Sequence, residues 1–281
     1  MKIDGRQIAT NILEELKTKV DVLKDQGVIP TMAVILIGNV KSSESYVKQK
    51  ELKAKIIGAE IKIFRFNETV TNEEIEVLIK KLDADKNVHG IILQRPTPKN
   101  INADLLENLI SPIKEIDGFG KKPLYAVPVA AAVFEVLDEI FGNLKEMDSF
   151  SVWLAKKKVV ILGKGETAGM PIINYFKNRE IDPIVIDSKT ENANAILSSA
   201  DIIISAVGKR EVIKTEELKQ GVILIGVGIS TNDEEKTQGD YDENKLEEIA
   251  SFYTTTPGGV GPVNVALLME NLVRACQNLS R

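Results

Sequence analysis

A tyrosine and a lysine four residues apart could do chemistry together. Tyr46 and Lys50 fall in the stretch 42–57, whose pattern predicts a helix, and residues at this spacing project from the same helix face. A tyrosine ring can stack on a flat ligand. Partial burial lowers the pKa of a lysine toward neutrality, where it can give or take a proton. The pair therefore indicates a proton-transfer site beside a planar ligand.

Two polar side chains from other stretches could complete this site. Gln94 follows the apolar run 90–93, a predicted buried strand, and ligands gather at strand ends in open α/β sheets. Its amide can hydrogen-bond the Lys50 amine. Asp117 lies in the predicted loop 111–120, and its carboxylate can accept two parallel N–H bonds from one edge of a planar ligand. Taken singly, each of these residues has a plainer reading, as a packing tyrosine, a solvated lysine, a strand-end amide or a turn acid.

A glycine-rich turn in the second half indicates a dinucleotide site. The apolar run 159–162 leads straight into Gly163, Gly165 and Gly169 and then into a predicted helix. Glycines permit a tight turn, and the N–H groups of a helix N-terminus favour a pyrophosphate. Asp187 ends the next predicted strand, near the offset at which an acid binds the adenosine ribose. The glycine spacing is one residue longer than the common G-x-G-x-x-G pattern, so the motif alone is only moderately specific. The alternative is that Asp187 is an ordinary surface acid in a turn, as can occur on any doubly wound α/β domain.

The residues around this turn leave the choice of cofactor open. Asp187 would repel a 2′-phosphate and so favours NAD. Lys164, Ser188 and Lys189 could hold that phosphate and so favour NADP. We take NADP as the expected cofactor and keep NAD as the alternative because of Asp187.

Strand-like and helix-like stretches alternate, which is typical of an α/β fold with parallel strands. The expected strands are 32–37, 60–66, 90–93, 159–162, 184–186, 202–206 and 222–225. Asp4 is expected to cap a first helix, and Thr71 with Glu74 forms a capping box for another. The stretch 142–155 is mixed in character and is interpreted as a linker.

The chain is therefore expected to form two domains with a cleft between them. Residues 1–145 are expected to form an N-terminal α/β catalytic domain, and residues 146–258 a Rossmann-like dinucleotide-binding domain. The last helix, predicted at Val263–Leu279 within the range 259–281, is expected to pack back onto the first domain.

The composition limits which classes of binding partner and which cellular compartment we expect. The 281 residues carry a net charge of −5 with acids and bases interleaved, which argues against nucleic acid as a partner. The single cysteine, Cys276, excludes an intramolecular disulfide and fits a reducing compartment. The N-terminus is charged, and no apolar run approaches the roughly 20 residues of a membrane span. We expect a cytoplasmic protein with no membrane partner.

Four stretches go beyond what a generic α/β fold requires. They are Ser45-Tyr46-Val47-x-x-Lys50, Gly90-Ile91-Ile92-Leu93-Gln94-x-Pro96-x-Pro98, Lys114-x-Ile116-Asp117-Gly118-Phe119 and Pro257-Gly258-Gly259-Val260-Gly261-Pro262. In this order, with the glycine turn between the last two, they resemble the bifunctional methylenetetrahydrofolate dehydrogenase/methenyltetrahydrofolate cyclohydrolase family. The resemblance covers nearly the whole chain.

The resemblance implies a reaction and a set of residue roles. The reaction is oxidation of 5,10-methylenetetrahydrofolate with NAD(P)+ to the 5,10-methenyl form, followed by hydrolysis to 10-formyltetrahydrofolate. Lys50 would be the proton-transfer residue, with Tyr46 and Gln94 as its partners. The resemblance also implies a homodimer. We expect no metal site, because the sequence offers no evident set of metal ligands. The expected binding residues are Asp117, Tyr46, Pro257, Gly258 and Gly259 for the folate, and Gly163, Lys164, Gly165, Gly169, Asp187, Ser188, Gly228 and Ile229 for the cofactor.

The sequence also departs from the family pattern. His89, the only histidine, stands where the family has an acid, and we interpret it as structural. Arg95 replaces the leucine that follows the family's glutamine. Gly226 and Ser230 replace the Asp and Asn of a cofactor-side motif. Two alternatives therefore stay open: a drifted, non-catalytic folate- or nucleotide-binding protein, and a reductase for a non-folate substrate.

Overall fold

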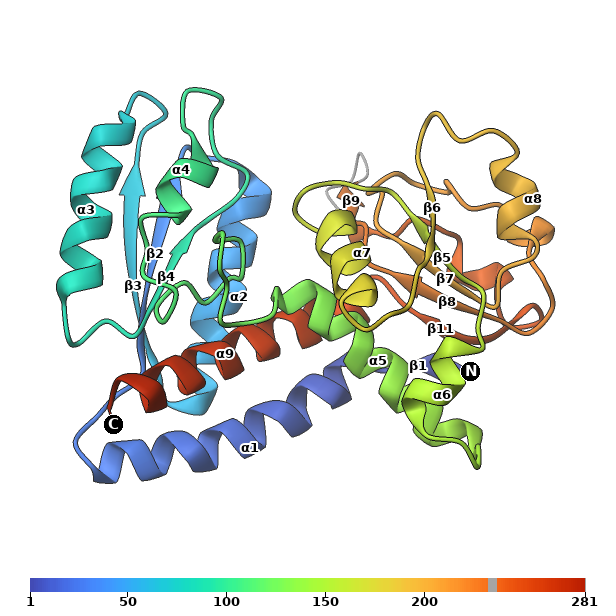
Figure 1. The fold of residues 1–281 in the computed structure, drawn as a ribbon, viewed down its shortest axis with the longest axis horizontal. Helices are drawn as coiled ribbons and strands as arrows, with labels where there is room; N and C mark the ends of the chain where they lie inside the picture. Colours follow the sequence, from blue (N-terminus) through green and yellow to red (C-terminus); the bar gives the residue numbers. More distant parts are fainter. Residues whose placement is uncertain (232–236, 281) are drawn as a thin grey trace. The chain divides into compact units, whose positions relative to one another are not determined.

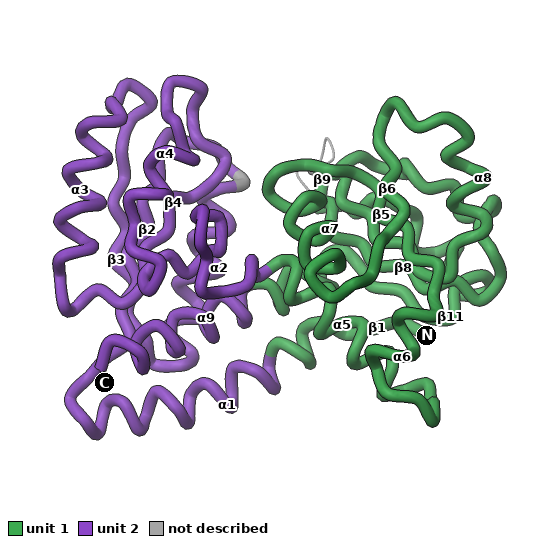
Figure 2. Tube along the Cα trace, viewed as in Figure 1, with its two compact units in different colours: residues 1–9, 129–264 green, residues 10–128, 265–281 purple. Residues whose placement is uncertain are grey.

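The computed structural model describes residues 1–231 and 237–280. The chain divides into two compact units (Figure 2). Each unit has its own parallel sheet. We call residues 1–9 and 129–264 unit 1, and residues 10–128 and 265–281 unit 2. Helices α1 (Gly5–Asp25) and α9 (Val260–Leu279) each contribute residues to both units.

Unit 2 is built on three parallel strands in the order β3-β2-β4. Every residue of the central strand β2 is buried, which accounts for its continuous apolar run. Figure 1 shows α3 and α2 on opposite sides of these strands. The elements are β2 (Thr31–Ile37), α2 (Lys41–Ile57), β3 (Glu60–Phe66), α3 (Asn72–Ala84), β4 (Gly90–Leu93) and α4 (Ala103–Glu107).

Local sequence signals explain where these helices begin and end. The side chain of Asp4 accepts the Arg6 N–H at 2.9 Å, as expected for the cap of α1. The capping box of Thr71 and Glu74 at the start of α3 is confirmed. Gly58 ends α2 with a left-handed φ of 78°.

Unit 1 holds a six-stranded parallel sheet in the order β1-β11-β8-β7-β5-β6. The chain runs from β5 to β6 on one side and then returns to β7 on the other, so the strand order reverses beside β5. Ligands bind at such a reversal in open α/β sheets. The strands are β1 (Lys2–Ile3), β5 (Val159–Leu162), β6 (Ile184–Ile186), β7 (Ile202–Ser205), β8 (Val222–Gly226) and β11 (Ala250–Thr254).

Helices and short elements complete unit 1. They are α5 (Pro128–Leu144), α6 (Phe150–Ala155), α7 (Gly169–Lys177), α8 (Ala193–Leu197), the strand pair β9 (Ser230–Thr231) and β10 (Thr237–Gln238), and 3₁₀ turns at Thr215–Glu217 and Glu243–Lys245. None of the helices in the described part of the chain combines the length and apolarity that a membrane span requires.

The structure corrects the sequence analysis in three places. The stretch 142–155 is not simply a linker, because it contains α6, whose Trp153 and Leu154 are buried. Strand β11 was not predicted, nor was its pairing with β1, which places the first residues of the chain in unit 1. Helix α9 begins at Val260 rather than Val263. The contact-based units thus differ from the boundaries expected at 145 and 258, and the assignment of functional domains to those ranges stays a prediction.

Candidate active site

The middle of α2 carries the buried lysine of the site. Lys50 is only 6% exposed, and its Nζ donates to Oε1 of Gln94 at 2.8 Å, so the hydrogen bond expected from the sequence is present. Burial lowers the pKa of Lys50, and the charge of Asp117 partly opposes this shift. The amine is therefore easier to deprotonate than a solvated lysine and lies within electrostatic range of the Asp117 carboxylate.

Gln94 is fixed in one orientation at the end of β4. Its Nε2 donates to the backbone carbonyl of Arg95 at 2.7 Å, which leaves Oε1 for the Lys50 amine. Tyr46, one turn before Lys50 on α2, is half-buried, and burial raises the pKa of its hydroxyl. The Tyr46 phenol is therefore neutral at physiological pH and can donate a hydrogen bond.

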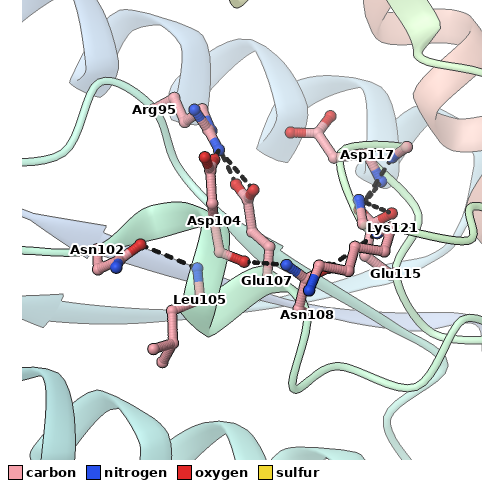
Figure 3. Close-up of polar contacts among 11 residues, drawn as sticks. Arg95, Asn102, Asp104, Leu105, Glu107, Asn108, Glu115, Asp117 and Lys121 are labelled. Atoms are coloured by element: carbon pink, nitrogen blue, oxygen red, sulfur yellow. Dashed lines mark hydrogen bonds and ion pairs between the residues drawn. The ribbon is translucent and has the colours of Figure 1, made fainter.

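A buried carboxylate shapes the loop that presents Asp117 (Figure 3). Oε1 of Glu115 accepts the backbone N–H groups of Asp117 at 3.0 Å and Gly118 at 2.9 Å, and Oε2 accepts that of Gly120 at 3.1 Å. Gly118 has φ +81°, and a Cβ there would lie 2.8 Å from the backbone nitrogen of Val127. Among the described residues, the Asp117 carboxylate itself accepts no hydrogen bond, so its oxygens are available to a ligand.

Two more anchors hold this loop. The buried Lys114 amine donates to backbone carbonyls at the end of α3. Asn271, on the unit 2 part of α9, donates to the Ile116 carbonyl at 2.9 Å. Asp117 is therefore presented by a preorganised loop, which lowers the entropy that a ligand must overcome when it binds.

The environment of Glu115 predicts a pH dependence of stability. Burial is the largest cause that raises its pKa from the ordinary 4.5 to about 7, and the charges of Asp117 and Glu107 add to it. Between these values the folded protein binds more protons than the unfolded chain. The free energy of unfolding should therefore fall by roughly 3 kcal/mol as pH rises from about 4.5 to about 7.

Urea unfolding of the wild type and of Glu115→Gln at several pH values checks this. The variant should be less stable, because an amide NH₂ faces a backbone N–H, but it should lack this part of the pH slope. Equal slopes in the two proteins would contradict the assigned pKa.

Ser43, which was not predicted from the sequence, is a further polar residue on the same face of α2. Ser43 lies three residues before Tyr46 and seven before Lys50, a spacing that places all three on one side of the helix. Its hydroxyl is buried and has no hydrogen-bond partner among the residues that the structure describes. A buried hydroxyl without a partner is costly, so we add Ser43 to the candidate site. The helical spacing was the available signal.

His89 has the structural role expected of it. Its Nδ1 accepts the backbone N–H of Thr31 at 3.1 Å, which joins the start of β4 to the start of β2. Burial lowers the pKa of His89, and the Lys114 charge adds to this shift. The neutral ring that this hydrogen bond requires is therefore the favoured form.

In unit 1 the glycine turn follows β5, where the strand order reverses. Gly163 has φ +95°, and a Cβ at Gly169 would lie 2.3 Å from the Gly163 carbonyl oxygen, so a side chain cannot be accommodated there. Gly165 has open space beside it and is exposed. This turn leads into α7, and its bare backbone fits the close approach of a pyrophosphate.

Asp187, the acid expected to bind the ribose, is held in place by an ion pair and a backbone hydrogen bond. Lys164 Nζ lies 2.5 Å from Oδ2 of Asp187 and is the main reason that the pKa of Asp187 falls to about 2. Oδ1 of Asp187 accepts the Lys189 N–H at 2.9 Å, so the carboxylate also shapes the turn after β6. Ser188 is exposed in this turn.

A buried aspartate that the sequence analysis missed organises the ends of β7 and β8. Asp240 accepts the Ser205 hydroxyl at 2.6 Å and the N–H groups of Val207 at 3.0 Å and Lys209 at 2.9 Å. A Cβ at Gly228 would lie 2.2 Å from its carboxylate, so the predicted cofactor residue Gly228 is required for this close approach. No apolar pattern marks Asp240, and only the fold reveals its role.

The remaining predicted site residues also lie in unit 1. Ile229 is 42% exposed next to Gly228. Gly258 and Gly259 are buried, and Pro257 is exposed. A Cβ at Gly5, at the start of α1, would lie 1.9 Å from the Gly259 carbonyl oxygen. This turn therefore has a packing role against α1 in addition to the ligand contact that its sequence predicts.

The two units together define an NAD(P)-dependent α/β enzyme with a separate catalytic domain. Residues 3–117 match the family model of the tetrahydrofolate dehydrogenase/cyclohydrolase catalytic domain, and residues 141–280 match that of its NAD(P)-binding domain. The chain belongs to the tetrahydrofolate dehydrogenase/cyclohydrolase family.

Individual relatives agree over nearly the full length. The bifunctional protein FolD of Lactococcus lactis subsp. cremoris is 33% identical over 97% of this chain and 95% of its own length. The crystal structure of the bifunctional enzyme FolD from Campylobacter jejuni has a TM-score of 0.88 at 31% identity and covers 99% of each chain. A Trypanosoma brucei structure, solved with NADP cofactor and an inhibitor, has a TM-score of 0.90 at 28% identity and covers 100% of this chain and 98% of that one.

These comparisons confirm the family expected from the sequence. The protein is an enzyme of folate one-carbon metabolism with a dehydrogenase and a cyclohydrolase activity, and its second domain binds NAD(P). The comparisons with these relatives favour the folate reaction over the two alternatives, a non-folate reductase and a non-catalytic binding protein.

Proposed function

We propose that unit 2 binds tetrahydrofolate derivatives through Asp117 and Tyr46 and that Lys50 moves the protons of the hydrolytic step. The hydrogen bond between Lys50 and Gln94, within electrostatic range of Asp117, carries this proposal. These residues come from α2, from the end of β4 and from a separately anchored loop. Their convergence in one unit favours a shared site over four unrelated surface roles.

The hydrolytic step needs an acid or base close to neutrality. Water attacks the resonance-stabilised methenyl cation, and the resulting carbinolamine loses and gains protons as the ring opens to the formyl product. The Lys50 amine, with its lowered pKa, takes a proton from the attacking water and returns it to the departing ring nitrogen, while the hydroxyl proton of the carbinolamine leaves to solvent as the formyl carbonyl forms. Gln94 holds the amine in place, and Asp117 anchors the amino-pyrimidine edge.

The dehydrogenase step depends on unit 1. NAD(P)+, when bound, supplies the hydride acceptor. The turn 163–169 leaves room for the pyrophosphate, Gly228 and Ile229 form part of the same strand-end surface, and Asp240 fixes the neighbouring loop. Pro257, Gly258 and Gly259 are proposed to contribute to folate binding, with Pro257 as the exposed member of this turn.

A coupled absorbance assay tests the proposed function. Purified protein is mixed with 5,10-methylenetetrahydrofolate and either NADP+ or NAD+, and the reduced cofactor and the methenyl product are followed separately. Reduced cofactor should form, and added methenyltetrahydrofolate should disappear faster than in buffer. Cofactor reduction with other substrates but none with methylenetetrahydrofolate would support the non-folate reductase instead.

We propose NADP as the preferred cofactor, which the NADP-bound relative supports, with Asp187 as a residue that weakens this preference. Replacing Asp187 by Ser removes a fixed negative charge and releases Lys164 to pair with a 2′-phosphate. We expect the ratio of kcat/KM for NADP over NAD to rise about 10-fold, which corresponds to about 1.4 kcal/mol.

Asp182→Ser, an exposed aspartate before β6, serves as the matched control. An unchanged cofactor ratio in Asp187→Ser, or an equal change in the control, would remove Asp187 from cofactor selection. We also propose a homodimer, which the resemblance implies, and a cytoplasmic location, which the free, buried Cys276 fits. Sedimentation of the purified protein tests the dimer.

A further inference from the structure

Arg95 makes a buried ion pair beside the candidate site (Figure 3). Its Nε and Nη2 donate to the two oxygens of Glu107 at 2.9 and 2.6 Å. The side chains are 13% and 4% exposed, so both charged groups are largely removed from water. A bidentate pair of this kind holds the planar guanidinium in one orientation.

The fixed guanidinium lies against the loop that carries Asp117. Cζ of Arg95 is 5.2 Å from the centroid of the Phe119 ring, within the range of a cation–π interaction. Phe119 is two residues beyond Asp117. On its other side, Arg95 directly follows Gln94, and its carbonyl accepts the Gln94 amide. One residue thus contacts both the strand end that holds Gln94 and the loop that presents Asp117.

The charges around the guanidinium support this bridging role. The charge of Asp117 contributes to raising the pKa of both Glu107 and Glu115, so these three carboxyl groups lie near one another in unit 2. Arg95 is the cation that pairs with Glu107 in this cluster. A third contact, to Asp104, is to a side chain that is 83% exposed and adds little.

We propose that Arg95 is a positioning residue for folate: held by Glu107, it fixes Phe119 and thereby sets the place of Asp117 relative to Gln94 and Lys50. This inference rests on the proposed function of Asp117 as the folate anchor. The family pattern has leucine at this position, so the ion pair is a feature in which this chain differs from that pattern. We expect the Arg95–Glu107 ion pair to affect the affinity for folate and not the chemical step or cofactor binding. The reason is that the Arg95 guanidinium takes part neither in the Lys50–Gln94 hydrogen bond nor in the cofactor turn.

The test removes both charges together, so that no buried carboxylate is left without a partner. Replacing a buried ion pair with apolar residues of similar volume is often tolerated, so Arg95→Leu with Glu107→Leu is expected to fold. The KM for methenyltetrahydrofolate should rise about 3- to 10-fold, with kcat within about 2-fold of wild type. The Kd for the cofactor should not change.

Phe119→Leu supplies the second arm of the experiment. It should raise the KM by a similar factor, and combining it with the double variant should give no further rise, because both changes remove the same interaction. Asp104→Asn is the matched control and should behave as wild type. If the double variant does not fold, Arg95→Lys, which loses the planar fork, takes its place in the same cycle.

A wild-type KM in the variants, or KM effects that multiply, would overturn the positioning role. A purely structural ion pair would change the melting temperature without the split between KM and kcat. Failure of the proposed function is separately visible, because the wild-type protein would then turn over no folate substrate.

Discussion

Replacing Lys50 by Met is expected to slow hydrolysis of methenyltetrahydrofolate by at least about 100-fold, the usual contribution of a positioned acid or base. Lys50 is the only residue of the proposed set with an amine, and its pKa is lowered by burial. Methionine keeps most of the length of the lysine side chain but cannot transfer a proton. Folate binding should persist, because Asp117 and its loop do not depend on the amine. The measurement is the decay of methenyl absorbance, together with a binding titration.

The chain offers a matched control for this substitution. Lys48 lies on the same helix but is exposed, so Lys48→Met removes an equal charge from α2 without touching the site. It should hydrolyse the substrate at the wild-type rate. The melting temperature of Lys50→Met should not fall steeply, because the substitution removes the cost of burying a charge while leaving one Gln94 oxygen without its donor. Wild-type hydrolysis by Lys50→Met would remove the amine from the mechanism.

Regular elements were predictable where local pattern and tertiary environment agree. Strand β2 is buried on both faces and therefore reads as a continuous apolar run. Helix α3 begins at a capping box that is explicit in the sequence. In contrast, β1 is two residues long and pairs with β11 from the far end of the chain, so no local signal marks it. Short strands of this kind are specified by long-range pairing.

The candidate site shows the same division. The Lys50–Gln94 hydrogen bond was predictable, because the helix spacing and the strand end each indicated a polar group with a suitable partner. The Arg95–Glu107 pair and the carboxylate of Asp240 were not, because each serves a loop whose course depends on tertiary packing. Glu115 is an intermediate case. Its place beside Asp117 is visible in the sequence, but the three N–H groups that it accepts are a property of the folded loop.

Replacing Asp117 by Asn should weaken folate binding by about 100-fold, or about 3 kcal/mol. The carboxylate can accept two parallel N–H bonds from the amino-pyrimidine edge, whereas the Asn amide would turn one NH₂ toward a donor. The loop should keep its conformation, because Glu115 bonds only to backbone groups there. The melting temperature should therefore stay near that of the wild type, with the exposed Asp104→Asn as the control.

The same substitution also tests whether positions 50 and 117 share a site. The Asp117 charge raises the pKa of Lys50 against the effect of burial, so its removal should lower that pKa further. At saturating substrate, the pH profile of hydrolysis should therefore shift to lower pH in Asp117→Asn, because the amine loses its proton more readily. A weaker affinity with an unshifted profile would mean that Asp117 anchors the pterin without acting on the lysine. An unchanged affinity would exclude Asp117 as the anchor.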